Sequence, residues 1–366
     1  MPSPLLRTLA AMAAGVAAMS AATVHAQPAE VEIAADKDWE HAWTEMSFPA
    51  SIGEFERSGV TAFEERETNI AGSYYHAGTD TILTLYIYRP GNPSTAIWFD
   101  RALIAIGAED AYGAVDLEDM KIGSFIPNGG TKASGLSAVL AVDGNFRSTG
   151  VAMYRSGEWL VKVRVSSRRL SVAQMDSVLK STLGRMPALD NVDPNPAQFV
   201  AECDAVPASS ATAVTENLGT IALGEAIALV AMQMPEEDRA TLEETGSLEA
   251  DPATLTYCRE GPRSRQYNVF RSADGSDRFT VALGDAGRSV DVYPDAVATE
   301  LDTTSAMTTY AVRSATGLEY VLHTPYVGLP SVQQVGQSLS GQVIATVTRP
   351  LEDGVGADIS LSVTPE

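Results

Sequence analysis

Short runs of β-branched and aromatic residues, each ended by turn residues, recur through most of this chain and favour folds built on antiparallel sheets. Residues 73–76 and 81–89 are two such runs, and the turn Gly78-Thr79-Asp80 joins them. A second pair, at 149–154 and 159–165, flanks Ser156-Gly157. Strands connected by so few residues must pair antiparallel. The sequence therefore predicts two hairpins in its first half.

The predicted strand at 159–165 has a regular alternation. Its odd-numbered positions are tryptophan or valine, and Lys162 and Arg164 lie between them. Successive side chains of a strand point to opposite faces of the sheet. We expect the apolar face to join a core and the face with Lys162 and Arg164 to be wet.

Helical spacing interrupts the strands at two places. Residues 172–186 have apolar side chains on one face, and Ser171 followed by Gln174 has the pattern of a capping box. A second helix is predicted over 95–106, with Ser94 as its N-cap. Together these elements predict an α+β domain at 38–189, in which helices pack on an antiparallel sheet.

Breakers and polar residues at 190–197 predict a linker, which is followed by a second α+β domain at 198–366. This domain is predicted to be rich in β-meander. Strands are expected at 266–271, 278–283, 289–293, 308–313, 319–323, 342–348 and 358–363. An apolar helix is expected at 219–234 and a short helix at 330–339, with a solvated acidic stretch at 235–251.

Residues 1–26 have the features of a secretory signal peptide. Arg7 precedes an apolar run at 9–19, and Val24-His25-Ala26 predicts cleavage after Ala26. We therefore expect a periplasmic or secreted protein that begins with a short tail at 27–37. The apolar run is shorter than the roughly 20 residues that cross a bilayer, so no membrane span is expected in the mature chain.

The chain contains two cysteines, Cys203 and Cys258. Export places them in an oxidising compartment, which favours a disulfide between them. They are too far apart in sequence for the Cys-x-x-Cys pattern of thiol exchange.

Charge is distributed unevenly along the chain. The formal net charge is −22, and loss of Arg7 with the leader would take it to −23, which argues against nucleic acid as a partner. Two acidic residues and eight basic ones nevertheless lie between 144 and 185. The basic residues are Arg147, Arg155, Lys162, Arg164, Arg168, Arg169, Lys180 and Arg185.

Four members of this basic stretch, at 147–185, form the candidate binding site: Lys162, Arg164, Arg168 and Arg169. Strand alternation places the first two on one face, and the other two follow the strand, so a contiguous patch is expected. Such a patch would bind an envelope protein or an anionic ligand. The alternatives are neutralisation by acids elsewhere, such as Glu64, Glu65 and Glu67, and ordinary solvated surface.

Motifs that carry chemistry are scarce. The chain has no Gly-x-Ser-x-Gly and no phosphate-binding glycine motif. Ser177 and Lys180 match Ser-x-x-Lys, but an exposed helix face explains that spacing. His41, His76 and His323 lack the i, i+4 spacing that would place two imidazoles together. We therefore expect no catalytic residues, no metal and no cofactor.

Several segments carry a resemblance to a known family: residues 39–49, residues 86–90, Trp98-Phe99-Asp100-Arg101, and GEWLVKVR at 157–164. With them the chain resembles uncharacterised exported proteins of alphaproteobacteria, which implies a compartment and no chemistry. The order of elements over about 38–187 is similar to the Mog1/PsbP-type α/β sandwich. That resemblance implies a non-catalytic partner of larger assemblies.

These observations favour a non-catalytic exported envelope protein that acts through protein contacts. One alternative is an unrecognised hydrolase with its site in the cleft between domains, where small-molecule pockets often form. Convergence of a histidine with an acid and a serine would indicate that alternative. Another alternative is a binder of an anionic ligand through the basic stretch.

Overall fold

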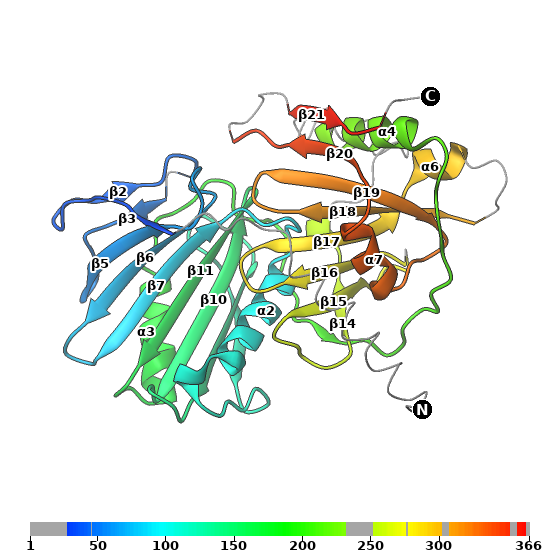
Figure 1. The fold of residues 1–366 in the computed structure, drawn as a ribbon. Helices are drawn as coiled ribbons and strands as arrows, with labels where there is room; N and C mark the ends of the chain where they lie inside the picture. Colours follow the sequence, from blue (N-terminus) through cyan, green and yellow to red (C-terminus); the bar gives the residue numbers. More distant parts are fainter. Residues whose placement is uncertain are drawn as a thin grey trace, which may run out of the picture.

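The computed structural model describes residues 28–44, 46–231, 252–275, 277–301, 307–351 and 357–363. The predicted signal peptide, its cleavage site and the acidic stretch at 235–251 lie outside these residues. The described chain has a mixed α+β fold with two large, mostly antiparallel sheets (Figure 1). Among its helices, none combines the length and apolar composition needed to cross a membrane.

The N-terminal half (residues 28–189) forms a sheet with the strand order β1-β5-β6-β7-β11-β10-β9-β8, and β4 pairs with β5. Its strands are β1 (Ala29–Glu30), β4 (Ser51–Ile52), β5 (Phe55–Ala62), β6 (Asn69–His76), β7 (Thr81–Tyr88), β8 (Lys121–Phe125), β9 (Gly135–Ala141), β10 (Ser148–Ser156) and β11 (Trp159–Ser167). A short ribbon pairs β2 (Trp39–Glu40) with β3 (Ser47–Phe48). Both predicted hairpins, β6-β7 and β10-β11, are confirmed. Because β1 pairs with β5, part of the predicted tail at 27–37 belongs to the sheet.

Helices cover both faces of this sheet. Helix α3 (Val172–Leu183) buries Met175 and Leu179 against one face, where Val161 and Val163 of β11 also pack. Helix α2 (Thr95–Ala108) packs on the other face with Leu160. The short 3-10 helix η1 (Asp110–Tyr112) follows α2. Both predicted helices are confirmed.

The C-terminal half (residues 198–363) forms a second sheet with the order β12-β14-β15-β16-β17-β18-β19-β20-β21, and β13 pairs with β19. Its strands are β12 (Ala201–Glu202), β13 (Thr212–Ala213), β14 (Tyr257–Glu260), β15 (Tyr267–Ser272), β16 (Phe279–Leu283), β17 (Arg288–Pro294), β18 (Thr309–Ala315), β19 (Glu319–Val327), β20 (Val343–Thr348) and β21 (Asp358–Leu361). From β14 to β21 each strand pairs with the next, so the predicted meander is confirmed.

Among the described residues of this half, the helical elements are α4 (Leu218–Ala231), η2 (Pro252–Thr254), α6 (Ala296–Leu301) and α7 (Val332–Leu339). Helix α4 packs with Leu322 and Val347 on one side of the sheet, whereas Val335 of α7 packs with Val312 on the other. Helix α7 begins later than predicted, since Ser331 is its N-cap.

The predicted disulfide between Cys203 and Cys258 is confirmed, with a sulfur–sulfur distance of 2.05 Å. Cys203 follows β12 and Cys258 lies in β14, and these two strands pair in parallel. The disulfide therefore attaches the start of the C-terminal half to its sheet.

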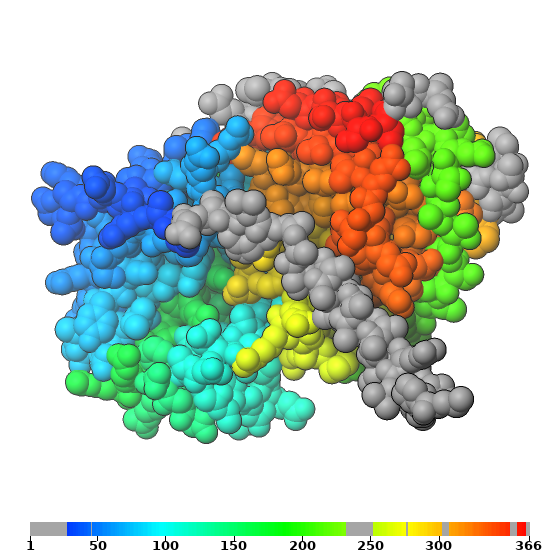
Figure 2. Space-filling view, viewed as in Figure 1, coloured from blue at the N-terminus to red at the C-terminus, as the bar shows by residue number. Residues whose placement is uncertain are grey.

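The two halves share a hydrophobic cluster around α2, which lies between the two sheets (Figure 1). Trp98 of α2 and Leu160 of β11 belong to this cluster together with Tyr257, Phe270 and Ala282 of the second sheet. Figure 2 shows the halves in direct contact, where blue surface meets orange and red. Helix α2 thus contacts the first sheet with one side and the second sheet with another.

Candidate functional site

Three members of the predicted basic patch lie over aromatic rings along β11 and just past its end. The distances from cation to ring centre are 4.4 Å for Lys162 over Tyr86, 4.6 Å for Arg164 over Tyr112 and 5.1 Å for Arg168 over Phe146. The last two rings are themselves stacked, with centroids 5.3 Å apart. Alternate positions of a strand share a face, so the three cations follow one line. We call these six residues the cation–aromatic row.

Lys162 is buried, with 6% of its surface exposed, so the expectation that it lies on a wet face is wrong. Its ammonium lies 3.0 Å from a carboxylate oxygen of Asp285, in the turn between β16 and β17. The charge of Lys162 is the main cause that lowers the pKa of Asp285. The C-terminal half therefore covers this end of the predicted patch.

Arg168 and Arg169 lie at the opposite end of the row and are exposed. The Arg168 guanidinium pairs with Asp80 at 2.9 Å, and its hydrogen bond is the main cause that lowers the pKa of this carboxyl. Arg169 donates a long hydrogen bond of 3.4 Å to the carbonyl of Gly78. The acids that meet the row are thus Asp80 and Asp285, from two distant turns.

Arg164 differs from its neighbours in the row. It is half-buried, and its Nε and Nη2 atoms are buried without a hydrogen-bond partner among the described residues. Thr84 of β7 lies opposite Arg164, and Ser73 of β6 lies opposite Thr84, so all three share a face. Both neighbours are half-buried, which leaves this part of the sheet face accessible. Arg164 is therefore a half-buried cation without a hydrogen-bond or ion-pair partner among the described residues, although its Nε and Nη2 atoms are themselves buried.

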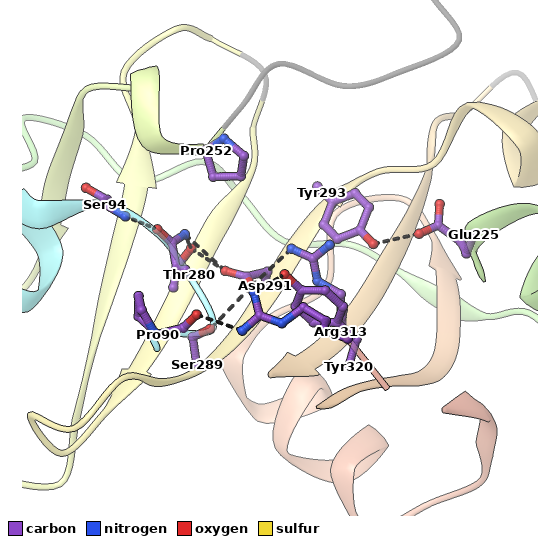
Figure 3. Close-up of polar contacts among 12 residues, drawn as sticks. Pro90, Ser94, Glu225, Pro252, Thr280, Ser289, Asp291, Tyr293, Arg313 and Tyr320 are labelled. Carbon is purple, nitrogen blue, oxygen red and sulfur yellow. Dashed lines mark hydrogen bonds and ion pairs between the residues drawn. The ribbon is translucent and has the colours of Figure 1, made fainter. Parts of the chain in front are cut away.

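A second polar cluster joins the two halves deep inside the protein (Figure 3). The side-chain amide of Asn92, which precedes α2, donates to Thr280 at 2.9 Å and to Asp291 at 3.2 Å. Thr280 also donates to Asp291 at 2.8 Å, and Arg313 pairs with the same carboxylate at 3.3 Å. We call this set the junction network.

Aromatic rings hold the arginines of the junction network. The Arg313 guanidinium lies between Tyr293 and Tyr320, at 4.9 and 4.6 Å from their ring centres (Figure 3). Arg349 donates to the Tyr320 hydroxyl at 3.0 Å and to the Pro90 carbonyl at 3.1 Å. The four side chains of the network named so far that carry a charge or an amide, Asn92, Asp291, Arg313 and Arg349, are all buried, which favours a structural role.

Glu225 of α4 extends the same network. Its carboxylate accepts a hydrogen bond of 2.6 Å from the Tyr293 hydroxyl. Burial raises the pKa of Glu225, and the bond from Tyr293 opposes that rise. No local sequence pattern predicts this network, because its members come from segments far apart in the chain.

The histidines do not meet one another. The ring of His41 bonds the Thr44 hydroxyl and the Glu67 carbonyl, and that of His76 bonds Thr79. The Nε2 atom of His323 lies 2.9 Å from the Ser314 hydroxyl, but its Nδ1 has no hydrogen-bond partner in the described part of the chain. This pair therefore lacks the acid that would complete a hydrolytic triad. The described residues also hold no group of three potential metal ligands.

The described surface is hollowed in several places. A groove of about 650 Å³ is lined by Trp43, Trp159 and Glu158, and the Glu158 carboxylate already pairs with Arg89 and Arg349. A groove of about 590 Å³ runs beside residues 30–35 and 57–60. A cavity of about 50 Å³ lies at the start of α2.

Comparison of the chain with models of protein families, with curated proteins and with solved structures found no match.

Proposed function

We propose that this chain is a non-catalytic exported protein that binds carboxylate groups of an envelope protein at the partly exposed section of the β11 face beside α2, with Arg164 as the main contact. The observation that carries the proposal is the half-buried Arg164 guanidinium, which lies 4.6 Å from the Tyr112 ring centre and has no hydrogen bond or ion pair among the described residues. A carboxylate that reached the exposed part of this guanidinium would give it a charged hydrogen-bond partner.

The surroundings of Arg164 suit a carboxylate. A guanidinium binds a carboxylate through two parallel hydrogen bonds, and the Tyr112 ring beneath Arg164 limits the orientations of its plane. Lys162 and Arg168 already have carboxylate partners, whereas Arg164 interacts with Asp285 only through the weaker attraction of charges that do not form an ion pair. Arg164 is therefore the member of the row that lacks a direct carboxylate partner among the described residues. A short acidic segment therefore fits better than a large anionic surface.

The strongly acidic remainder of the protein does not prevent such a contact. At physiological ionic strength, charges separated by more than about 8 Å are largely screened. The short-range attraction of Arg164 would then outweigh repulsion from distant acids. We expect the contact to weaken at high salt, because exposed charge pairs are screened.

The wider proposal concerns architecture and location. We propose that residues 38–189 form a Mog1/PsbP-type sandwich, that 198–366 form a second domain, and that cleavage after Ala26 releases the protein into the periplasm or outside the cell. The sheet between α2 and α3 supports the sandwich. The disulfide is compatible with an oxidising compartment.

The test is binding of an octaglutamate peptide to the mature protein, followed by NMR at the Arg164 side chain. Arg164→Gln should weaken binding by at least about tenfold, because hydrogen bonds to charged groups contribute about 1.5–3 kcal/mol. Arg185→Gln is the matched control, since Arg185 follows α3, is exposed, and has a side-chain hydrogen bond to Ser181. Equal affinities of Arg164→Gln and wild type, or peptide binding that leaves the Arg164 resonance unmoved, would contradict the proposal.

A further inference from the structure

Strand β8 is the last strand at one end of the N-terminal sheet. It pairs antiparallel with β9 over residues 121–125. On its outer side no strand of the described residues follows, and the described loops make no backbone hydrogen bond with residues 121–126. An open strand edge presents a row of backbone N–H and C=O groups that can bind another extended strand.

The other three outer strands of the two large sheets each carry a carboxylate. These residues are Glu30 of β1, Glu202 of β12 and Asp358 of β21. Charged side chains on an edge strand oppose its pairing with another chain. Residues 122–126 carry no charge, so β8 offers the least electrostatic protection against pairing among these four edges.

Two exposed isoleucines lie on one face of this edge. Ile122 of β8 is 47% exposed, and Ile126, directly after β8, is 58% exposed. Alternation places both on the same face as Ser124, which lies midway between them. Phe125 points to the opposite face, where its ring packs with that of Tyr154 in the core beneath α3. The isoleucines therefore form an apolar surface beside the free backbone groups.

The spacing of these residues suits pairing of β8 with a second copy of itself. Across a two-fold axis, residue i of one copy lies opposite residue j of the other, and j lies opposite i. With the axis at Ser124, Ile122 of each copy lies opposite Ile126 of the other, so four isoleucines meet on one face. Phe125 lies opposite Gly123, which has no side chain to obstruct the ring.

Charges around β8 also match across this axis. Exposed acids at 116–119 precede the strand, and the exposed Lys132 follows it. Antiparallel pairing brings the segment that enters β8 in one copy toward the segment that leaves it in the other. Lys121 lies opposite Pro127, so no two like charges face each other within the paired strands. This match favours a second copy over an unrelated strand.

We propose that two copies of this protein associate by antiparallel pairing of their β8 edges, with a two-fold axis at Ser124. The backbone groups of the edge supply hydrogen bonds, and the isoleucines supply apolar contacts between the strands. The two N-terminal sheets would then form one continuous sheet. The inference concerns a surface distinct from Arg164 and goes beyond the proposed function.

The first test measures the mass of the mature protein by sedimentation equilibrium. Wild type should shift from one chain toward two as its concentration rises. Ile122→Lys should weaken association at least about tenfold, because the axis doubles the loss of each isoleucine contact and lysine on an edge strand opposes pairing. Ile359→Lys is the matched control, since Ile359 is 41% exposed on β21, the outer strand of the other sheet. It should associate as wild type does.

The second test measures the register of the two strands. Cys203 and Cys258 form a disulfide and are the two cysteines of the chain, so a new cysteine has no free thiol to meet within its own chain. Ser124→Cys should give a crosslinked dimer on oxidation, because opposite residues of paired strands lie within reach of a disulfide. Lys121→Cys should not, since the two copies of this position would lie about 20 Å apart along the strands.

Wild type that stays monomeric at every concentration would overturn the proposal, and so would a dimer that Ile122→Lys leaves intact. Equal crosslinking of Ser124→Cys and Lys121→Cys would reject the two-fold register. Monomeric wild type whose β8 amide resonances shift with a peptide of unrelated sequence would assign the edge to a foreign strand and reject the second copy.

Discussion

Individual buried arginines of this protein connect distant segments of the chain through several hydrogen bonds each. Arg101 of α2 is 2% exposed and donates to the carbonyls of Gly284, Ser264 and Arg265 in the C-terminal half. It also donates to the side-chain oxygen of Asn268. A guanidinium has five donors in one plane and can satisfy several carbonyls that would otherwise be buried unpaired. Burial is the main cause that lowers the pKa of Arg101.

His323 makes stability depend on pH. Burial lowers its pKa from 6.5 to about 4, so the unfolded chain binds a proton at a higher pH than the folded protein does. Stability is therefore highest above pH 6.5 and falls as the pH drops toward 4, by at most about 3 kcal/mol from this group. His323→Gln should reduce the loss of urea midpoint between pH 7 and pH 4.5.

His76→Gln provides the control for this prediction, because His76 is half-buried in β6 and contacts Thr79. It should keep the pH dependence of wild type. If urea midpoints of wild type and His323→Gln change in parallel with pH, His323 is not the group responsible.

The candidate site shows what sequence can and cannot predict at this scale. Alternation along β11 correctly places Lys162 and Arg164 on one face, because that depends on neighbouring residues alone. The acid that pairs with the buried Lys162 is Asp285, which lies 123 residues later in a turn between two strands of the other sheet. The unsatisfied donors of Arg164 likewise depend on which distant groups approach it. No local pattern carries that information.

Two helices of this protein begin in the same way. In α3 the Ser171 hydroxyl accepts from the Gln174 N–H, and the Gln174 side chain accepts from the Ser171 N–H. Ser331 and Gln334 form the same capping box at α7. Each box satisfies two backbone donors that the helix leaves free.

We expect Ser171→Ala and Ser331→Ala each to lower the free energy of unfolding by about 1 kcal/mol, the usual contribution of an N-cap. Ser177→Ala is the control, because Ser177 is exposed inside α3 and its hydroxyl bonds only the Ala173 carbonyl. That variant should unfold as wild type does or slightly later. Urea denaturation measures all three. Unchanged midpoints in both cap variants would show that the boxes do not stabilise the helices.

Elements with strong local patterns could be predicted, and those with weak ones could not. The hairpin β10-β11 and helix α3 combine clear periodicity with turn or cap residues. Strand β5 has Gly59 beside a bulge, and β8 is short and mostly exposed, so neither shows a regular alternation. The pairing of β7 with β11, which unites the two predicted hairpins in one sheet, depends on tertiary packing.

At the scale of the whole molecule, the junction between the halves combines apolar and polar contacts. The cluster around α2 draws on both sheets, and Asp100 of α2 pairs with Arg259 of β14 at 2.7 Å. Asn92 and Arg101 add hydrogen bonds to the second sheet. Breaking the junction would expose all these polar groups together. Residues 190–197, predicted as a linker, would then connect two halves that unfold as one unit.

This coupling leads to a prediction about cooperativity. All four tryptophans, Trp39, Trp43, Trp98 and Trp159, lie in the N-terminal half, and only Trp98 among them belongs to the cluster that the halves share. Their summed fluorescence therefore reports mainly the N-terminal half, whereas far-ultraviolet circular dichroism reports both. In wild type the two urea transitions should coincide. Arg101→Met leaves buried carbonyls of the C-terminal half unpaired and should destabilise that half by about 3 kcal/mol. The circular dichroism of this variant should then change at a lower urea concentration than its tryptophan fluorescence does.

Arg147→Met is the control for this last prediction, because Arg147 is exposed and donates only to the carbonyl of Arg169 within the N-terminal half. Its two transitions should coincide as in wild type, since no contact between the halves is lost. Coincident transitions in Arg101→Met would mean that the remaining contacts around α2 are enough to couple the halves. Separate transitions in wild type would mean that the buried junction does not couple them at all, despite its hydrogen bonds and ion pairs.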